Sequence, residues 1–122
     1  MSRLELAWPH LLHDNHRLMP ILRGKRAVLI TAPDYRKAKA EAELRFKAQW
    51  RDRMLEGDVR LHAKLWFPDL RKRDAANYRK LVTDALTGIA YSDDSQLVIE
   101  TWEKAGLDRV HPRCELELTE IP

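Results

Sequence analysis

Three carboxylates in the second half of the chain have the type and setting of ligands for a hard divalent cation. Asp74 precedes a predicted helix, where free backbone N–H groups and the helix dipole favour an anion. Asp93 and Asp94 stand in a turn beyond that helix, just before a predicted strand. If helix and strand pack as neighbours, the carboxylates can converge on Mg²⁺, which prefers oxygen ligands. A purely structural interpretation makes Asp74 a helix cap and Asp93–Asp94 a polar turn.

A lysine near these carboxylates would complete the requirements for phosphodiester hydrolysis. Asn77, Lys80 and Asp84 fall within about 60° of one another around the predicted helix, on a stripe beside its apolar side. A metal-activated water attacks a phosphodiester where a nearby cation stabilises the developing charge. Lys80 is the candidate for that role.

Charge is unevenly distributed along the chain, and a local positive surface fits a polyanionic partner. Residues 1–90 carry 19 bases and 11 acids, whereas residues 91–122 carry 3 bases and 8 acids. The net charge is only +3, so the positive charge is local. Two segments would hold a phosphate backbone. The cations of these segments are Arg71, Lys72 and Arg73 in one, and Arg17, Arg23, Lys25 and Arg26 in the other.

Other chemically capable residues give weaker signals. His10, His13 and His16 have a regular spacing that could bind Zn²⁺, but the segment is irregular and offers no fourth ligand nearby. We expect this segment to contact a partner instead. Cys114 alternates with leucines and is expected to be a small apolar core residue. Trp66 falls on the outward phase of its strand, where it would stack on a base or, as we prefer, lie in a dimer interface.

Hydrophobic periodicity predicts the elements that position these residues. A single domain over residues 1–122 is expected, with the order β-β-α-β-α-β-β. This order indicates an α+β (mixed α/β) fold with a single sheet of about five strands and two helices on one face. The first two strands could form a hairpin across a long basic loop at 9–25. Strands are predicted at 3–8, 26–31, 60–67, 95–104 and 113–121, and helices from the cap Thr31 to the stop at Gly57 and over 75–87.

Bulk composition narrows the class of protein. Hydrophobic residues make up 44% and charged residues 34% of the chain, which is typical of a soluble globular protein. There is no run of about 18 apolar residues and only one cysteine, so neither a membrane span nor a disulfide framework is expected. A cytoplasmic location is the expectation.

The stretch FPDLRKRDAANYRKLVTDALTGIAYSDDSQLV (67–98) resembles the RusA family of Holliday junction resolvases. The shared pattern is Pro-Asp, a basic run, an Asp-x-Asp-Asn motif, a lysine three residues later, an Asp-Ala-Leu helix end and an Asp-Asp pair. The N-terminal part is similar too, with LAWP, a loop that holds Asn15 and Arg17, and then RGKRAVLITAPDYRKA. The resemblance therefore covers most of the chain.

The resemblance implies a small homodimer, often encoded by a phage or prophage, that binds four-way DNA junctions. Such an enzyme makes paired symmetric nicks with Mg²⁺ as cofactor in recombination and repair. Asp74 and Asp94 fall on metal-binding carboxylate positions, Asp93 is a supporting candidate, and Lys80 falls on the catalytic lysine position. The residues expected to contact DNA are Arg17, Arg23, Lys25, Arg26, Arg71, Lys72, Arg73, Asn77 and Arg79.

One position departs from the family pattern. Ala76 stands where the motif has its second Asp, and a methyl group cannot bind a metal. Losing one of three carboxylates should weaken Mg²⁺ binding strongly and make the pocket more attractive to phosphates. Little or no cleavage is therefore expected from this chain. It is either a natural member that binds DNA without efficient cutting or an Asp→Ala version of an active enzyme, and the otherwise complete motif favours the second explanation.

Overall fold

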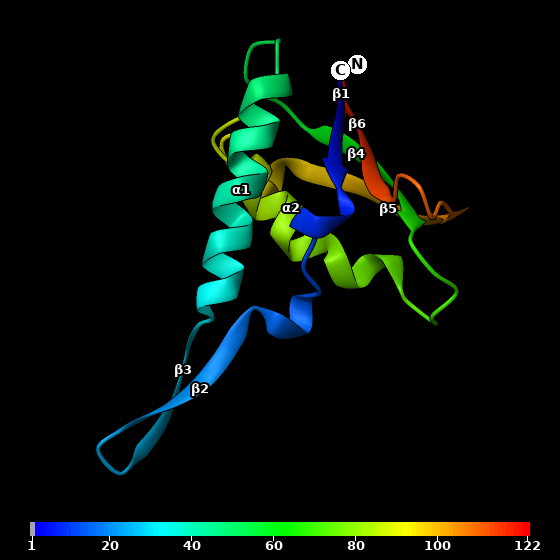
Figure 1. Ribbon diagram of the computed structural model, residues 1–122. Coiled ribbons are helices and arrows are strands. Elements are labelled where there is room, and N and C mark those ends of the chain that lie inside the picture. Colours follow the sequence, from blue (N-terminus) through cyan, green and yellow to red (C-terminus); the bar gives the residue numbers. More distant parts are fainter. Residues whose placement is uncertain (1) are drawn as a thin grey trace.

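A mixed sheet with helices on one face forms the body of the protein, and a separate hairpin extends from it (Figure 1). The computed structural model describes residues 2–122. The sheet has the strand order β1-β6-β4-β5, with β6 antiparallel to both neighbours and β4 parallel to β5. Its strands are β1 (Ser2–Ala7), β4 (Val59–Phe67), β5 (Leu97–Leu107) and β6 (Arg113–Glu120).

Alternation of apolar and polar residues fixes which face of the sheet is buried. In β4, every second residue from Val59 to Phe67 is buried, while the residues between them are exposed or half-buried. The register aligns Ala63 with Leu116 and Leu65 with Cys114, so apolar side chains form rows across the strands. Each fully buried leucine contributes about 1.5–3 kcal/mol. The predicted inward side of β4 and the apolar role of Cys114 are confirmed.

The first helix, α1 (Pro33–Gln49), is shorter than predicted. Its four-residue apolar spacing buries Ala42 and Phe46, as expected. The prediction that it continues to a stop at Gly57 is wrong, because the chain turns to extended backbone at Trp50. Gln49 explains the stop: its side chain accepts from the Glu5 N–H and donates to the Glu5 carbonyl, both at 2.7 Å, which ties the helix end to β1.

The start of α1 also differs from the prediction. Thr31 is the last residue of a strand, and the N-cap is Ala32, which has no side-chain oxygen to bond the first turn. Pro33 and Asp34 occupy the first turn, as expected. A proline needs no hydrogen-bond partner there and Asp34 suits the helix dipole, so the helix begins without a polar cap.

The second predicted helix is present as two consecutive parts. A 3-10 helical segment, η3 (Ala75–Tyr78), leads directly into α2 (Arg79–Leu86). The apolar side of this unit is buried, including Tyr78, Leu81, Val82 and Ala85. Gly88 ends it with a φ of 88°, a backbone conformation that favours glycine.

The long loop expected over residues 9–25 is wrong in its second half. It contains two 3-10 turns, η1 (Trp8–His10) and η2 (Asp14–His16), and then a strand, β2 (Leu18–Arg23). β2 pairs with β3 (Arg26–Thr31) through a turn at Gly24, whose φ is 64°. The resulting two-stranded sheet projects away from the body (Figure 1).

The number and pairing of strands need correction for the same reason. Residues 2–122 form a four-stranded and a two-stranded sheet instead of a single sheet of about five strands. The first two predicted strands do not pair with each other. β1 instead pairs with β6, which places Ser2 opposite Leu118 and brings the two ends of the chain together (Figure 1).

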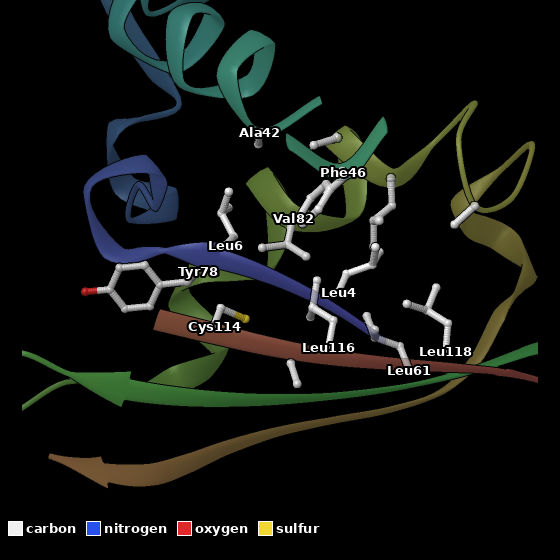
Figure 2. Close-up of a cluster of buried hydrophobic side chains, with 14 of the residues drawn as sticks. Leu4, Leu6, Ala42, Phe46, Leu61, Tyr78, Val82, Cys114, Leu116 and Leu118 are labelled. Atoms are coloured by element: carbon white, nitrogen blue, oxygen red, sulfur yellow. The ribbon is translucent and has the colours of Figure 1, made fainter. Parts of the chain in front are cut away.

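One core lies between the sheet and the helices. Figure 2 shows Phe46 of α1 and Val82 of α2 above the apolar row that includes Leu4, Leu116 and Leu118. Sheet and helices share this cluster, which confirms that the helices cover a single face. Within residues 2–122, no helix is both long and apolar enough to cross a membrane.

Candidate functional site

Asp74 lies at the point where the chain enters the second helical unit. It is exposed and is the N-cap of η3: its Oδ1 accepts from the Ala76 N–H at 3.2 Å. The Asn77 N–H donates to the Asp74 carbonyl at 3.1 Å. The carboxylate borders a surface pocket of about 290 Å³, lined also by His13, Lys72, Arg73 and Asn77. Asp74 therefore caps this unit while facing a cationic hollow.

Asp93 and Asp94 lie at the other end of this unit, beside a different pocket. Asp93 caps a 3-10 turn, η4 (Asp94–Gln96), and the Ser95 N–H that it accepts lowers the pKa of its carboxyl. Asp94 is half-buried. Both border a hollow of about 340 Å³, together with Asp84 and Lys39. The polar-turn interpretation describes the local geometry here correctly.

The carboxylates do not form a complete metal site. Asp74 and Asp94 border separate pockets, and across residues 2–122 no group of three or more Asp, Glu, His or Cys side chains is placed to hold a metal ion. Ala76 is exposed next to the Asp74 cap, so its methyl group occupies the position at which the motif would supply a further carboxylate. The donor set present does not fit a divalent cation.

Within the described residues, the histidines do not form a metal site either. His13 and His16 have ring centroids 6.1 Å apart, and His13 packs edge-on against Tyr78. His13 Nδ1 accepts a hydrogen bond from the Asn15 N–H at 3.1 Å. The ring of His13 thus serves packing and capping.

Lys80 is held in the first turn of α2 by two carboxylates. Its Nζ lies 3.1 Å from Asp84 Oδ1, and its backbone N–H donates to Asp14 Oδ1 at 3.1 Å. Asp84 also accepts a hydrogen bond from the Tyr35 hydroxyl of α1. Burial and the bond to Asp84 raise the pKa of Tyr35, and burial raises the pKa of Asp14. Lys80 therefore has a defined position that links η2, α1 and α2.

The sequence did not indicate that Tyr35 contacts Asp84 or that Asp14 contacts Lys80. Asp84 lies four residues after Lys80 on one helical stripe, so this pair was predictable. Tyr35 is 49 residues from Asp84, and Asp14 is 66 residues from Lys80. Only the packing of α1 and η2 against α2 brings them together.

Two of the predicted DNA-contacting arginines have internal partners. Arg73 forms a two-pronged ion pair with Asp69 and stacks over the ring of Trp8, 5.1 Å from its centroid. Its hydrogen bond to Asp69 lowers the pKa of that carboxyl to about 2. Arg79 forms a two-pronged pair with Glu100 of β5, with distances of 2.6 and 2.7 Å. These two guanidinium groups are structural in the free protein, and their contact with DNA stays a prediction.

The other predicted contacts are mainly at the surface. Arg71 is 81% exposed in its side chain and lies 3.9 Å from Asp69, and Lys72 is exposed. Asn77 and Arg17 are half-buried, and the Arg17 carbonyl accepts from the Ala32 N–H at the base of the hairpin. At the tip of the hairpin, the three cations are exposed and take part in no ion pair with the described part of the chain. They are Arg23, Lys25 and Arg26.

Trp66 lies on the sheet face that the helices leave uncovered. Its indole N–H donates to Glu115 at 2.6 Å, and the guanidinium of Arg113 lies 5.0 Å from its ring centroid. The outward orientation is as predicted. The ring has polar and cationic neighbours within its own chain, and its role in a dimer or with a base remains a prediction.

The fold and these residues define a class: a small α+β protein whose acidic helix cap and anchored lysine stand beside a basic surface. The family model for the endodeoxyribonuclease RusA matches residues 16–119, and the chain belongs to this family. RusA proteins are nucleases that resolve Holliday junctions, so membership places the chain among nucleases that act on branched DNA. Comparison with curated protein sequences gives no significant match.

Proposed function

We propose that this chain recognises four-way DNA junctions as a homodimer and cuts them weakly or not at all. The observation that carries the proposal is Ala76. It leaves Asp74 and Asp94 without a third carboxylate, while the basic surface and the anchored Lys80 remain.

The charge at position 76 sets the balance between binding and cutting. Mg²⁺, the proposed cofactor, is normally bound through carboxylates, and removal of one ligand weakens such a site strongly. The same change removes a negative charge beside the Asp74 cap, so phosphates meet less repulsion. The expected outcome is retained or tighter junction binding together with lost cleavage.

Lys80 is the residue proposed to act on the scissile phosphate. Its ammonium group would stabilise charge on the phosphate or on the attacking or leaving oxygen. Asp84 and Tyr35 are positioning residues in this proposal, because they fix where that ammonium group stands. Asp74 and Asp94, with Asp93 in support, are the proposed metal ligands of a version that has Asp at position 76.

A homodimer suits this substrate. A four-way junction has two equivalent strands to cut, and a twofold dimer presents two identical sites. The exposed cations Arg71 and Lys72, and those at the hairpin tip, would hold the phosphate backbone.

The test compares this chain with its Ala76→Asp version on a labelled four-way junction with Mg²⁺. Ala76 is exposed, so the new carboxylate is expected to be tolerated without unfolding. Ala40→Asp, at an exposed position of α1, is the matched control for an added charge. Symmetric nicks are expected from Ala76→Asp alone. If Ala76→Asp binds junctions but does not nick them, the assignment of the catalytic residues is wrong.

The alternative candidate is a non-catalytic protein that binds branched DNA, with Ala76 as its natural residue. It is favoured by the absence of a three-carboxylate cluster within residues 2–122. It predicts tight, salt-sensitive junction binding and no nicking by either version. Equal affinity for a junction and a linear duplex would argue against both candidates.

A further inference from the structure

The β2–β3 hairpin exposes apolar side chains on a face that no other part of residues 2–122 covers. Opposed residues share a face, so Leu18, Pro20 and Leu22 of β2 lie on the same side as Ala27 and Leu29 of β3. All five are exposed, Leu22 at 77% and Leu29 at 67%. We call these five residues the apolar hairpin face. Figure 1 shows the hairpin standing clear of the sheet and both helices.

Such a face is unusual for an element that serves only the fold. A lone two-stranded hairpin is marginally stable in water, and contiguous exposed apolar residues generally mark an interaction site. The hairpin offers its own cations no acid to pair with, since residues 17–33 contain four cations and no acid. Its function is therefore expected to involve a partner that takes up both features.

The arrangement of charge indicates which partner this is. Arg23 and Arg26 are paired directly at the tip, and Leu22 and Ala27 form the next pair inward. The unpaired cations therefore stand at the tip, one residue beyond Leu22 and Ala27, and by strand alternation their pair belongs to the opposite face of the hairpin. DNA offers both complements, phosphates for the tip and bases for the apolar face. A second copy of this chain could cover the apolar residues, but it would also have to supply acids for the cations at the tip.

We propose that the hairpin inserts its apolar face into the branch point of a DNA junction, where base stacking is interrupted, while its tip holds the flanking phosphates. Leucine and proline are among the side chains that proteins use as wedges between base steps. Each strand has six residues, so the arm is about 20 Å long, well beyond the roughly 8.5 Å depth of a major groove. The arm is therefore long enough to reach the branch point from outside the grooves. This proposal rests on the proposed function, because it takes branched DNA as the substrate.

The experiment places the fluorescent base 2-aminopurine at the branch point of a four-way junction and, separately, within a linear duplex. The double variant Leu22→Ser/Leu29→Ser removes the two most exposed leucines of the apolar hairpin face and keeps all cations. Leu44→Ser is the matched control, because Leu44 is 65% exposed on α1, away from the hairpin. Circular dichroism establishes that both variants are folded, as substitution of exposed residues should allow.

The unchanged chain and Leu44→Ser should raise the fluorescence of the branch-point base on binding. The double variant should lose that increase and bind the junction about tenfold more weakly, with duplex affinity changed less than about twofold, because insertion into a continuous duplex must first unstack a base step at a cost in free energy. An unchanged fluorescence increase and affinity in the double variant would overturn the proposal. Loss of dimerisation by that variant in sedimentation would also overturn it, because a second copy would then cover the face.

The two proposals can fail separately. If the unchanged chain prefers junctions over duplex but gives no fluorescence change at the branch, the hairpin proposal alone is overturned. If it shows no preference for junctions, the proposed function fails and takes the hairpin proposal with it.

Discussion

Replacing Glu100 with glutamine separates the structural role of Arg79 from its predicted contact with DNA. In the free protein, the bidentate ion pair between Arg79 and Glu100 joins the start of α2 to β5. The indole N–H of Trp102 also donates to Glu100 at 3.0 Å. Glutamine has nearly the same shape and keeps one acceptor oxygen. The substitution therefore removes the negative charge and one of the two bonds to the guanidinium.

The size of the effect follows from the exposure of the pair. A hydrogen bond to a charged group contributes about 1.5–3 kcal/mol. Arg79 is 37% exposed and Glu100 is 19% exposed in their side chains, so solvent screening reduces this value. We expect Glu100→Gln to lower the free energy of unfolding by about 1–2 kcal/mol at pH 7, measured by urea denaturation.

The difference in the free energy of unfolding between the original chain and Glu100→Gln should decrease at low pH. Burial opposes ionisation of Glu100, but the bonds from Arg79 and Trp102 outweigh it and lower the pKa of the carboxyl below 4.5. A lowered pKa stabilises the folded state above the unfolded pKa, and this stability is lost as the pH falls through the folded value. The gap between the original chain and Glu100→Gln should therefore narrow when denaturation is repeated below about pH 4.5.

The same variant frees a cation for DNA. If Arg79 contacts a phosphate once released, the slope of log affinity against log salt for a junction should steepen by about 0.9. Glu103→Gln is the matched control on the same strand, since Glu103 pairs with His62 and not with an arginine. If Glu100→Gln leaves unfolding and salt dependence unchanged while Glu103→Gln behaves the same way, the pair has neither role. A stability loss with an unchanged slope would confine Arg79 to the fold.

Three more predictions test the core and the titrating groups. Phe46→Ala empties a fully buried site and should cost about 3–5 kcal/mol in urea denaturation; a loss under about 1 kcal/mol would contradict the packing of α1 on the sheet. The carboxyl carbon of Asp69 should titrate in NMR with a pKa of about 2, so its ion pair persists down to that pH, and Arg73→Gln should return the pKa towards 3.8. Burial raises the pKa of Cys114 and hides its thiol, so a thiol reagent should react with it only in denaturant, and fast reaction under native conditions would refute its place in the core.

Elements with one buried face were predictable from sequence, because burial imposes a period on the residues. The alternation over residues 60–67 gave β4 and its inward side, and the apolar stripe of residues 75–87 gave the second helical unit. β2 lacks such a period, since all its apolar residues except the half-buried Ile21 are exposed on a hairpin with no core beneath it. Pro20 within it also argued against a strand. The end of α1 could not be predicted either, since the bonds of Gln49 to β1 are made only in the folded protein.

In the candidate site, too, local contacts were predictable from the sequence and contacts between distant residues were not. Capping by Asp74 and Asp93 is local, and both caps follow from the residue types at helix starts. The pair of Arg73 with Asp69 spans four residues and was visible in the sequence, although we assigned that arginine to DNA. The partner of Arg79 is 21 residues away on β5, where no pattern points to it. Partners of charged residues depend on tertiary packing, so charge runs overstate how many cations are free.

The position of β6 has a consequence for how the chain folds. β6 is synthesised after the other strands of its sheet, yet it lies inside that sheet and is the only neighbour of β1 in the described part of the chain. β1 must therefore wait for about a hundred further residues, or roughly 5–20 s of translation, before it can pair. Until then, the leucines of β1 and β4 lack the neighbouring side chains of β6. Pairings so distant in sequence make folding slow, and removal of residues 113–120 would take out a central strand instead of trimming an edge.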